Sequence, residues 1–474
     1  MNDDFKANGF RKAPAKGNKF DRRRILRASG GLTAATVGAR FLHGSAFAQE
    51  ATPAASPPPI PDYATNPEIE GDIQFWHFWG SPLRRTAVQR IIAGFNQVYP
   101  NIKVTETAVP FSDIWTKNLA AVAAGSGMPN VIVEDRPTLP DRAKNEVEIS
   151  LGDLATRDGV TGDAFWPFTW QEATVEGVPY GLPYETDIRV LYYNKAAFTE
   201  AGLDPETPPT NWDELWSFAD KLDKKDGDTL ERIGFFPTLG SAGLDQWGWN
   251  NGGHWQDADF NPTINAPENV AALEWMKSWA DRYGYSNVQA LQSTFGSGTQ
   301  DGFMSGKIAM MVDIQGYTSV MNFFNPKFTL PDSEENLGYG VGPITPAPGH
   351  EPVALSGGFA LSIPRGSDQT DASWEFIKYM VFVGQASWAR DTYAMPTIEA
   401  MAYDPVLAVS PNWPFFLDAM SYGRAKEYNP YYPAFTSDTL PLATEAALSG
   451  QQSPQDAMDE AQGNAEEEIE RARG

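Results

Sequence analysis

Hydrophobic residues between positions 72 and 133 change their spacing in a regular way. Short apolar or alternating runs predict strands, and apolar residues three or four positions apart predict helices. Five segments follow one another as strand, helix, strand, helix and strand: residues 72–80, 81–99, 102–106, 112–124 and 131–133. Ser112 is a plausible N-cap for the second helix. This order is typical of parallel α/β winding.

The same two periodicities continue through the rest of the chain. Apolar runs predict strands at residues 189–194, 308–312 and 359–363. Helical spacing predicts four further helices, at residues 212–222, 268–283, 371–383 and 454–473. Asn211 is the expected cap of the first of these helices. The last helix is rich in acidic residues, so we expect it to be exposed on most sides.

The composition of the chain argues against some classes of binding partner. The chain has 474 residues, with 61 Asp and Glu against 36 Lys and Arg, and a net charge of −25. Such an acidic protein is a poor candidate for binding nucleic acid or anionic lipid, because both need a concentrated basic face. An apolar fraction of 42% is enough for a large core. The absence of cysteine excludes disulfides, thiolate metal sites and cysteine nucleophiles.

The N-terminal segment has the pattern of an export signal. Residues 1–48 hold ten Lys and Arg but only three acidic residues. The run Asp-Arg-Arg-Arg-Ile-Leu-Arg at 21–27 resembles a twin-arginine signal, and a short apolar stretch follows it. Small residues at Ala46 and Ala48 predict cleavage after about Ala48. The apolar stretch is too short to span a bilayer, so we expect no stable membrane insertion. Residues 49–69 are rich in Ala and Pro and predict a linker.

A set of ordered motifs gives a resemblance to a known family. In these segments the chain is similar to the extracellular solute-binding proteins, of the sugar-binding type, that serve ABC importers. The segments are Phe75–Trp79, Phe95–Val104 with Ala123–Gly125 and Pro129–Val131, Gly177–Leu215, Asn251–Gly253 with Phe303–Met311, and Gly357–Pro364.

The resemblance implies an α/β, two-lobed periplasmic-binding-protein fold, type II-like, in which each lobe is a mostly parallel sheet flanked by helices. A hinge would join an N-lobe of residues 70–188 plus 356–394 to a C-lobe of residues 189–355 plus 395–474. Such a protein does no chemistry and needs no cofactor or metal. It would be a periplasmic monomer that closes on one small molecule and is read by the transmembrane subunits of an ABC permease.

Candidate ligand residues follow from where such a fold binds its ligand. Open α/β sheets bind ligands beyond the carboxyl ends of their strands. A sugar needs carboxylates and amides for its hydroxyls and flat rings for its C–H faces. These two rules, together with the places where the resemblance puts the crossings between lobes and the ligand loops, select the following residues: His77, Trp79, Ser81, Asp135, Glu185, Asp187, Trp249, Asn250, Gln315, Tyr317, Gly357, Gly358 and Tyr431.

Each candidate also has a purely structural interpretation. One of the two alternating pairs around Trp79 must belong to the core of its lobe. Asp135 is equally compatible with a solvated loop charge, and Asp187 with a hinge salt bridge. The glycines Gly357 and Gly358 suit a tight hinge turn as well as close approach to a ligand. The stretch 247–253 combines indoles, amides and glycines, which is unusual for a buried helix.

An enzyme is the alternative of another class. Asp135, Glu185 and Asp187 could supply the paired carboxylates of a secreted glycoside hydrolase. A serine hydrolase is less compatible, because the chain has no Gly-x-Ser-x-Gly elbow and its histidines beyond the signal are far apart in sequence. No His-Glu-x-x-His motif indicates a zinc site.

Two alternative ligands are compatible with the same fold. A cleft lined by acids and aromatic rings could hold a polyamine through charge and cation–π contacts. A sugar phosphate would need clustered cations, for which the candidates are Arg136, Arg189 and Arg390. The Trp-rich and amide-containing segments favour a neutral sugar or polyol.

Overall fold

The computed structural model describes residue 60 and residues 62–227, 229–328, 338–407 and 412–474. These residues belong to one compact unit, which runs from Ser56 to Gly474. The predicted export signal and its cleavage site lie outside the described residues. Within the described part, no helix combines the length and the apolar character needed to cross a membrane.

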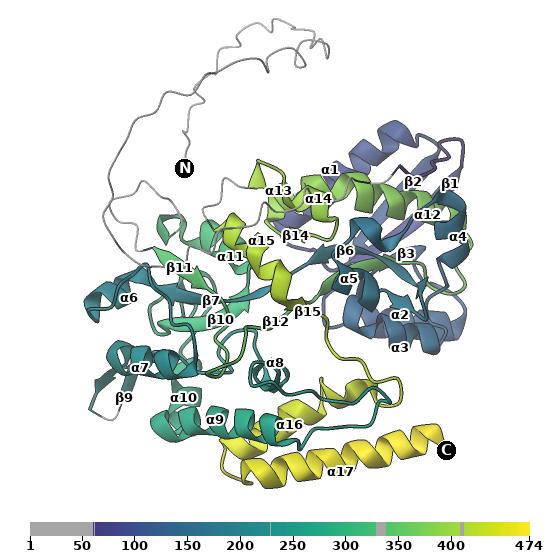
Figure 1. The fold of residues 1–474 in the computed structure, drawn as a ribbon. Helices are drawn as coiled ribbons and strands as arrows, with labels where there is room; N and C mark the ends of the chain where they lie inside the picture. Colours follow the sequence, from purple (N-terminus) through teal and green to yellow (C-terminus); the bar gives the residue numbers. More distant parts are fainter. Residues whose placement is uncertain (1–59, 61, 228, 329–337, 408–411) are drawn as a thin grey trace, which may run out of the picture. The chain divides into compact units, whose positions relative to one another are not determined.

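A six-stranded sheet holds the first predicted strands (Figure 1). Its order is β14-β6-β13-β3-β1-β2, and β1 pairs in parallel with both β2 and β3. The bounds are β1 Gly71–His77, β2 Ile102–Ala108, β3 Val131–Asp135, β6 Gly181–Thr186, β13 Gly358–Ser362 and β14 Met395–Pro396. Helices α1 (Pro82–Val98), α12 (Thr370–Tyr379) and α13 (Gln385–Thr392) pack near β1 and β14.

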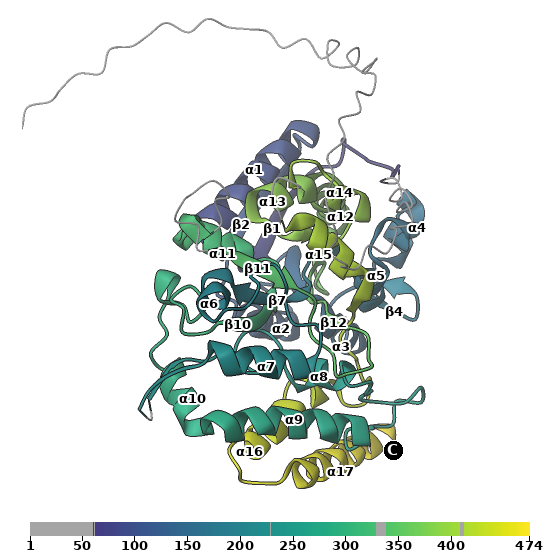
Figure 2. The same ribbon diagram turned by 60° about the vertical axis from the view of Figure 1, so that its left-hand side comes forward.

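A three-stranded sheet lies at the centre of the second half of the fold. Its order is β10-β7-β11, with β7 at Arg189–Asn194, β10 at Met310–Ile314 and β11 at Tyr339–Gly342. Helices α9 (Pro267–Tyr283), α16 (Thr439–Leu448) and α17 (Pro454–Arg473) pack against one another in this half, as Figure 2 shows. Two short strands, β12 (Ala354–Leu355) and β15 (Gly423–Arg424), pair in parallel.

The remaining helices and strands are short. The helices are α2 Ile114–Ala124, α3 Leu139–Lys144, α4 Gly152–Asp158, α5 Pro167–Glu172, α6 Lys195–Glu200, α7 Trp212–Leu222, α8 Leu244–Trp249, α10 Tyr285–Gln292, α11 Tyr317–Phe324, α14 Glu399–Ala402 and α15 Trp413–Ala419. Two hairpins pair β4 (Thr174–Val175) with β5 (Val178–Pro179), and β8 (Lys224–Asp226) with β9 (Thr229–Arg232).

Local capping explains several helix starts. The side chain of Asn211 accepts a hydrogen bond from the Glu214 backbone N–H at 3.0 Å, so the predicted cap of α7 is confirmed. Ser112 does not cap α2. This helix begins at Ile114, and the Ser112 hydroxyl donates to the Asp113 carboxylate instead, at 2.8 Å.

Strand direction differs from the expectation of mostly parallel sheets. Strands β13, β6 and β14 are antiparallel to their neighbours in the six-stranded sheet, and the three-stranded sheet is wholly antiparallel. The reason is that neither β6 nor β13 belongs to a βαβ crossover: β6 leads directly into β7 of the three-stranded sheet, and β13 directly follows β12 of the two-stranded sheet. The α/β class holds, but the sheets are mixed and antiparallel.

Buried apolar side chains form two large clusters rather than one. The first packs on the six-stranded sheet and includes Ile73, Phe75, Val88, Phe95 and Trp374. The second surrounds the three-stranded sheet and includes Leu191, Leu215, Trp247, Met276 and Ala465. Each half of the fold therefore has its own core. The residue bounds predicted for the two lobes stay a prediction.

Candidate functional site

Two adjacent chain segments connect the six-stranded sheet to the other half of the fold. Strand β6 passes into β7 through Asp187 and Ile188, and β12 passes into β13 through Ser356 and Gly357 (Figure 1). The two crossovers are hydrogen bonded to each other. The Gly357 N–H donates to Asp187 Oδ1 at 2.9 Å, and the hydroxyls of Thr186 and Ser356 are 2.8 Å apart.

Gln315, from the second half of the fold, hydrogen bonds to the first crossover at the junction between the two halves. Its amide oxygen accepts from the Ile188 N–H at 2.8 Å, and its amide nitrogen donates to the Thr186 carbonyl at 3.3 Å. The side chain is almost fully buried. Both ends of this predicted ligand amide are therefore engaged by the first crossover.

Five charged side chains gather at the junction, and we call them the junction cluster: Asp135, Arg136, Glu172, Asp187 and Arg189. Arg136 is fully buried, and its Nη2 donates to Thr186 Oγ1 at 3.1 Å and also to the Gly357 carbonyl. The same atom lies 3.3 Å from a Glu172 carboxylate oxygen. Arg136 thus touches both crossovers and helix α5.

The junction cluster contains N–H donors that have no hydrogen-bond partner in the part of the chain that the structure describes. Among the described residues, Nε and Nη1 of Arg136 and Nε of Arg189 are buried without a hydrogen-bond partner. Arg189 pairs with Asp187 through its Nη1. Unpaired buried donors are uncommon in folded proteins, because each carries a desolvation cost. These donors indicate where a polar ligand or water can bind.

Burial also shifts the acids of the cluster. It raises the pKa of Asp135 to about 6, opposed by the positive charges of Lys426 and Arg136. It raises the pKa of Glu172 to about 7, against the attraction of Arg136 and a hydrogen bond from the Lys426 backbone N–H. Three acids face two guanidinium groups and the Lys426 ammonium, so the site offers donors and acceptors without a surplus of positive charge.

Of the candidates at the end of β1, His77 and Trp79 are buried against the six-stranded sheet, whereas Ser81 is exposed at the start of α1. Trp79 is almost fully buried, with its ring centroid 4.4 Å from that of Trp388 and 5.6 Å from that of His77. His77 Nε2 lies 2.9 Å from a Glu106 carboxylate oxygen. Ser81 accepts from the Arg84 N–H at 3.4 Å and caps α1.

Glu185 lies between these aromatic rings and the junction cluster. One carboxylate oxygen accepts from the Trp388 indole N–H at 2.6 Å. Burial raises the pKa of Glu185, while Arg84 and the indole hydrogen bond oppose that shift. In the sheet register, Glu185 is opposite Phe359 of β13.

Trp249 and Asn250 lie at the end of a helix, α8, all of whose residues are buried. Despite the composition of segment 247–253, buried helix extends as far as Trp249, and the indoles of Trp247 and Trp249 pack into the second core. The Trp249 N–H donates to Glu427 at 2.9 Å, and the Arg424 guanidinium lies 4.5 Å from the ring centroid. The Asn250 amide donates to the Val353 carbonyl at 2.7 Å.

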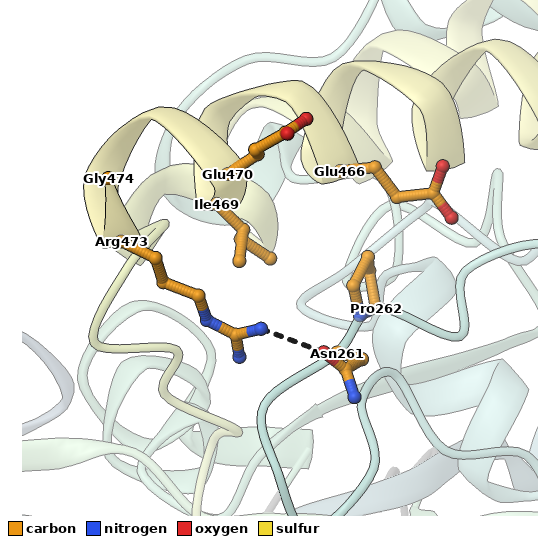
Figure 3. Close-up of a pocket in the computed structure, with 7 residues that line it drawn as sticks. All are labelled: Asn261, Pro262, Glu466, Ile469, Glu470, Arg473 and Gly474. Carbon is orange, nitrogen blue, oxygen red and sulfur yellow. Dashed lines mark hydrogen bonds between the residues drawn. The ribbon is translucent and has the colours of Figure 1, made fainter.

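Tyr317 and Tyr431 lie outside the junction cluster. The Tyr317 hydroxyl donates to Asp301 at 2.5 Å. The ring of Tyr431 lies between two cations, Lys144 at 5.6 Å and Arg473 at 4.5 Å from its centroid. Arg473 also donates to Asn261 at 2.9 Å beside a cavity of about 530 Å³ under the end of α17 (Figure 3).

Gly357 and Gly358 have different reasons to be glycine. Gly358 has a φ of +126°, and a Cβ there would lie 2.2 Å from the Glu185 carbonyl oxygen. Gly357 has no positive φ, and a Cβ there would meet the Arg189 guanidinium at 3.0 Å. Only Gly358 is required by the backbone itself, because two strands approach closely there.

We expect Gly358→Ala to lower the free energy of unfolding by about 2–3 kcal/mol, through a disfavoured backbone conformation and the clash with β6. Urea unfolding followed by tryptophan fluorescence measures the change. Gly357→Ala is the matched control and should cost clearly less, because the Arg189 side chain can move. Equal losses for both variants would show that close strand approach does not explain Gly358.

Four aromatic side chains that we did not select from the sequence border the junction, and we call them the ring platform: Phe78, Phe111, Trp115 and Phe359. Phe111 is 55% exposed, and the other three are half-buried. Phe111 follows β2, so the rule of strand carboxyl ends could have found it. Arg136 was considered only for an anionic ligand, and Glu172 gave no sequence signal.

The structure thus brings together six of the thirteen candidates around the junction: Asp135, Glu185, Asp187, Gln315, Gly357 and Gly358. It places the other seven in the two halves of the fold: His77, Trp79, Ser81, Trp249, Asn250, Tyr317 and Tyr431. The ligand-binding roles of all thirteen stay predictions.

Comparison with known proteins identifies the family. Residues 80–386 match the family model of the bacterial extracellular solute-binding proteins. The match covers most of both sheets and both crossovers. The chain belongs to this family. As a solute-binding protein it has the two-lobed α/β fold of its relatives.

Three relatives illustrate the range of the family. This solute-binding protein is 25% identical over 358 residues to the sn-glycerol-3-phosphate-binding periplasmic protein UgpB of Shigella dysenteriae serotype 1, covering 72% of this chain and 77% of UgpB. It is 25% identical over 215 residues to an arabinooligosaccharide-binding protein of Halalkalibacterium halodurans, covering 44% of this chain and 46% of the relative. The structure of CpMnBP1 with mannobiose bound matches with a TM-score of 0.74 and 28% identity, covering 84% of this chain and 100% of that one.

Proposed function

We propose that this protein captures a neutral sugar or polyol between its two lobes and delivers it to the transmembrane subunits of an ABC importer. The N-lobe comprises residues 70–188 plus 356–394, and the C-lobe comprises residues 189–355 plus 395–474. A twin-arginine signal directs the chain to the periplasm, where it is cleaved after about Ala48 and acts as a monomer without enzymatic activity. Family membership and the sugar ligands named for its relatives support this proposal.

The observation that carries the choice of cargo is the charge balance of the junction cluster. A sugar hydroxyl both donates and accepts a hydrogen bond, so it suits a site that holds carboxylates and free guanidinium N–H groups together. A phosphate carries only acceptors and needs a surplus of cations. Here the acids Asp135, Glu172, Asp187 and Glu185 outnumber the cations Arg136, Arg189 and Lys426.

One observation favours a second cargo, a sugar or polyol phosphate. The N–H groups of Arg136 and Arg189 that lack partners favour a ligand with hydrogen-bond acceptors. The relative UgpB is named for glycerol 3-phosphate. Three nitrogen atoms of the two arginines could donate to phosphate oxygens if Asp135 and Glu172 bound protons. Because burial raises the pKa of Glu172 to about 7, that arrangement would favour phosphate binding at acidic pH.

We expect disaccharides such as mannobiose to raise the melting temperature of the purified protein, because a ligand of the native state stabilises by about 2.7 kcal/mol at 100 times its Kd. Thermal shift followed by calorimetry should compare mono- and disaccharides of mannose, glucose and arabinose with sn-glycerol 3-phosphate and spermidine. A response to the phosphate or to spermidine without any response to sugars would contradict the proposal. Sugar released during prolonged incubation with mannobiose would instead indicate a hydrolase.

A further inference from the structure

The ring platform is a compact aromatic surface at the ends of three strands of the six-stranded sheet. The centroids of Phe78 and Phe359 are 4.6 Å apart, and those of Phe111 and Trp115 are 4.9 Å apart. Phe111 and Phe78 meet edge to face at 90° and 5.0 Å. Each ring contacts the other three, so the platform is one continuous surface.

The platform is held rigidly from below. The Trp115 indole N–H donates to the Val133 carbonyl at 3.1 Å, which fixes this ring on strand β3. Buried Ile114 and Ile132 pack beneath Trp115 and Phe78. Phe111 is the ring left 55% exposed. A rigid ring with an exposed face can stack on a ligand at little entropic cost.

The platform is continuous with the junction cluster through Phe359. In the strand register, Phe359 of β13 lies opposite Asp135 of β3 on one side and opposite Glu185 of β6 on the other. The carboxylates and the rings therefore belong to neighbouring positions of the same sheet. A ligand bound at Asp135 that extends away from the junction along this edge would meet the aromatic surface next.

We propose that the ring platform is a second sugar subsite, so that the ligand is an oligosaccharide of at least two units. This inference rests on the proposed function. The first unit binds the junction cluster through its hydroxyls, and the next unit places its C–H face on Phe111. Sugar rings suit this surface because they present apolar C–H faces while their hydroxyls remain at the rim.

The test uses Phe111→Ala, which removes an exposed ring without opening the core. Calorimetry should compare the mono-, di- and trisaccharide of whichever sugar series the wild-type protein binds. We expect the variant to bind the di- and trisaccharide about 3- to 10-fold more weakly, as loss of one aromatic contact predicts, and to bind the monosaccharide unchanged. Phe111→Trp should keep the preference for the longer ligands.

Phe323→Ala is the matched control, since Phe323 is 69% exposed on α11 and lies outside the platform. It should leave all affinities unchanged. Equal weakening of mono- and disaccharide by Phe111→Ala, or no weakening of either, would overturn the second subsite while leaving the proposed function in place. Loss of spermidine binding alone would identify a cation site instead. A wild-type protein that binds no carbohydrate would overturn the proposed function itself.

Discussion

Replacing Arg136 with methionine should lower the free energy of unfolding by about 3–5 kcal/mol, the usual cost of removing one partner from a buried ion pair. Arg136 is fully buried between Glu172, Thr186 and the Gly357 carbonyl. Without its guanidinium, Glu172 would remain buried with only a backbone N–H from Lys426. The variant should also bind ligand more weakly, because the junction loses the two unpaired donor atoms of Arg136.

Urea unfolding at pH 8 and pH 5 measures this effect. Burial already raises the pKa of Glu172 to about 7, and loss of the positive charge raises it further. The wild-type protein releases this proton above about pH 7, whereas the folded variant keeps it to higher pH, so the deficit of the variant should be smaller at pH 5 than at pH 8. The double variant Arg136→Met, Glu172→Gln should recover part of the loss. An unchanged urea midpoint for Arg136→Met would exclude the proposed role of Arg136 in stability.

Replacing Arg142 with methionine should also lower the free energy of unfolding by about 3–5 kcal/mol. In this case the charge that is lost neutralises a pair of acids in the N-terminal half. Arg142 Nη2 lies 2.9 Å from a carboxylate oxygen of both Glu134 and Glu148. Both acids are almost fully buried, and Asn118 donates to Glu148 at 3.0 Å. Methionine would leave two buried carboxyl groups without a counter-charge.

The sign of the pH dependence follows from the direction of the shifts. Burial and the neighbouring Glu148 raise the pKa of Glu134 well above its usual range. Its contribution to stability is complete below about pH 4.5 and is lost as the pH rises through the folded-state value. Arg142 opposes these shifts at both Glu134 and Glu148, so without it both carboxyl groups keep their protons to higher pH, and the loss caused by Arg142→Met should grow as the pH rises.

Two variants complete this experiment. Glu134→Gln should flatten the pH dependence above pH 4.5 and, combined with Arg142→Met, should recover much of the stability. Arg365→Met removes an exposed ion pair with Glu146 and should cost about 0–1 kcal/mol. If Arg142→Met costs no more than Arg365→Met, the buried acids do not depend on Arg142.

Much of the fold follows from apolar spacing. Strand β7 and helix α7 occupy the predicted residues 189–194 and 212–222, because burial of one face imposes its period on the sequence. Strand direction does not follow, since parallel and antiparallel strands share the same alternation. The pairing of strands that are distant in sequence decides it, as between β6 and β13.

The site was harder to predict than the fold. Asp135, Glu185 and Asp187 lie where strand ends predict, and the sheet register brings them near one another. Trp79 was harder to predict, because residues 76–79 are all aromatic and alternation alone does not say which of the two sets of rings is buried. The central place of Arg136 in the junction cluster was not predicted, since a single basic residue in a sequence gives no sign that it will be buried among acids.

The paired crossovers have a mechanical consequence. Thr186 and Asp187 on one segment are tied to Ser356 and Gly357 on the other, so the two segments cannot bend independently. Two neighbouring connections restrict the motion between the lobes to rotation about one hinge axis, whereas a single connection would also permit twisting. Any swing of one lobe against the other should therefore follow one path, which would let a partner recognise a single shut shape.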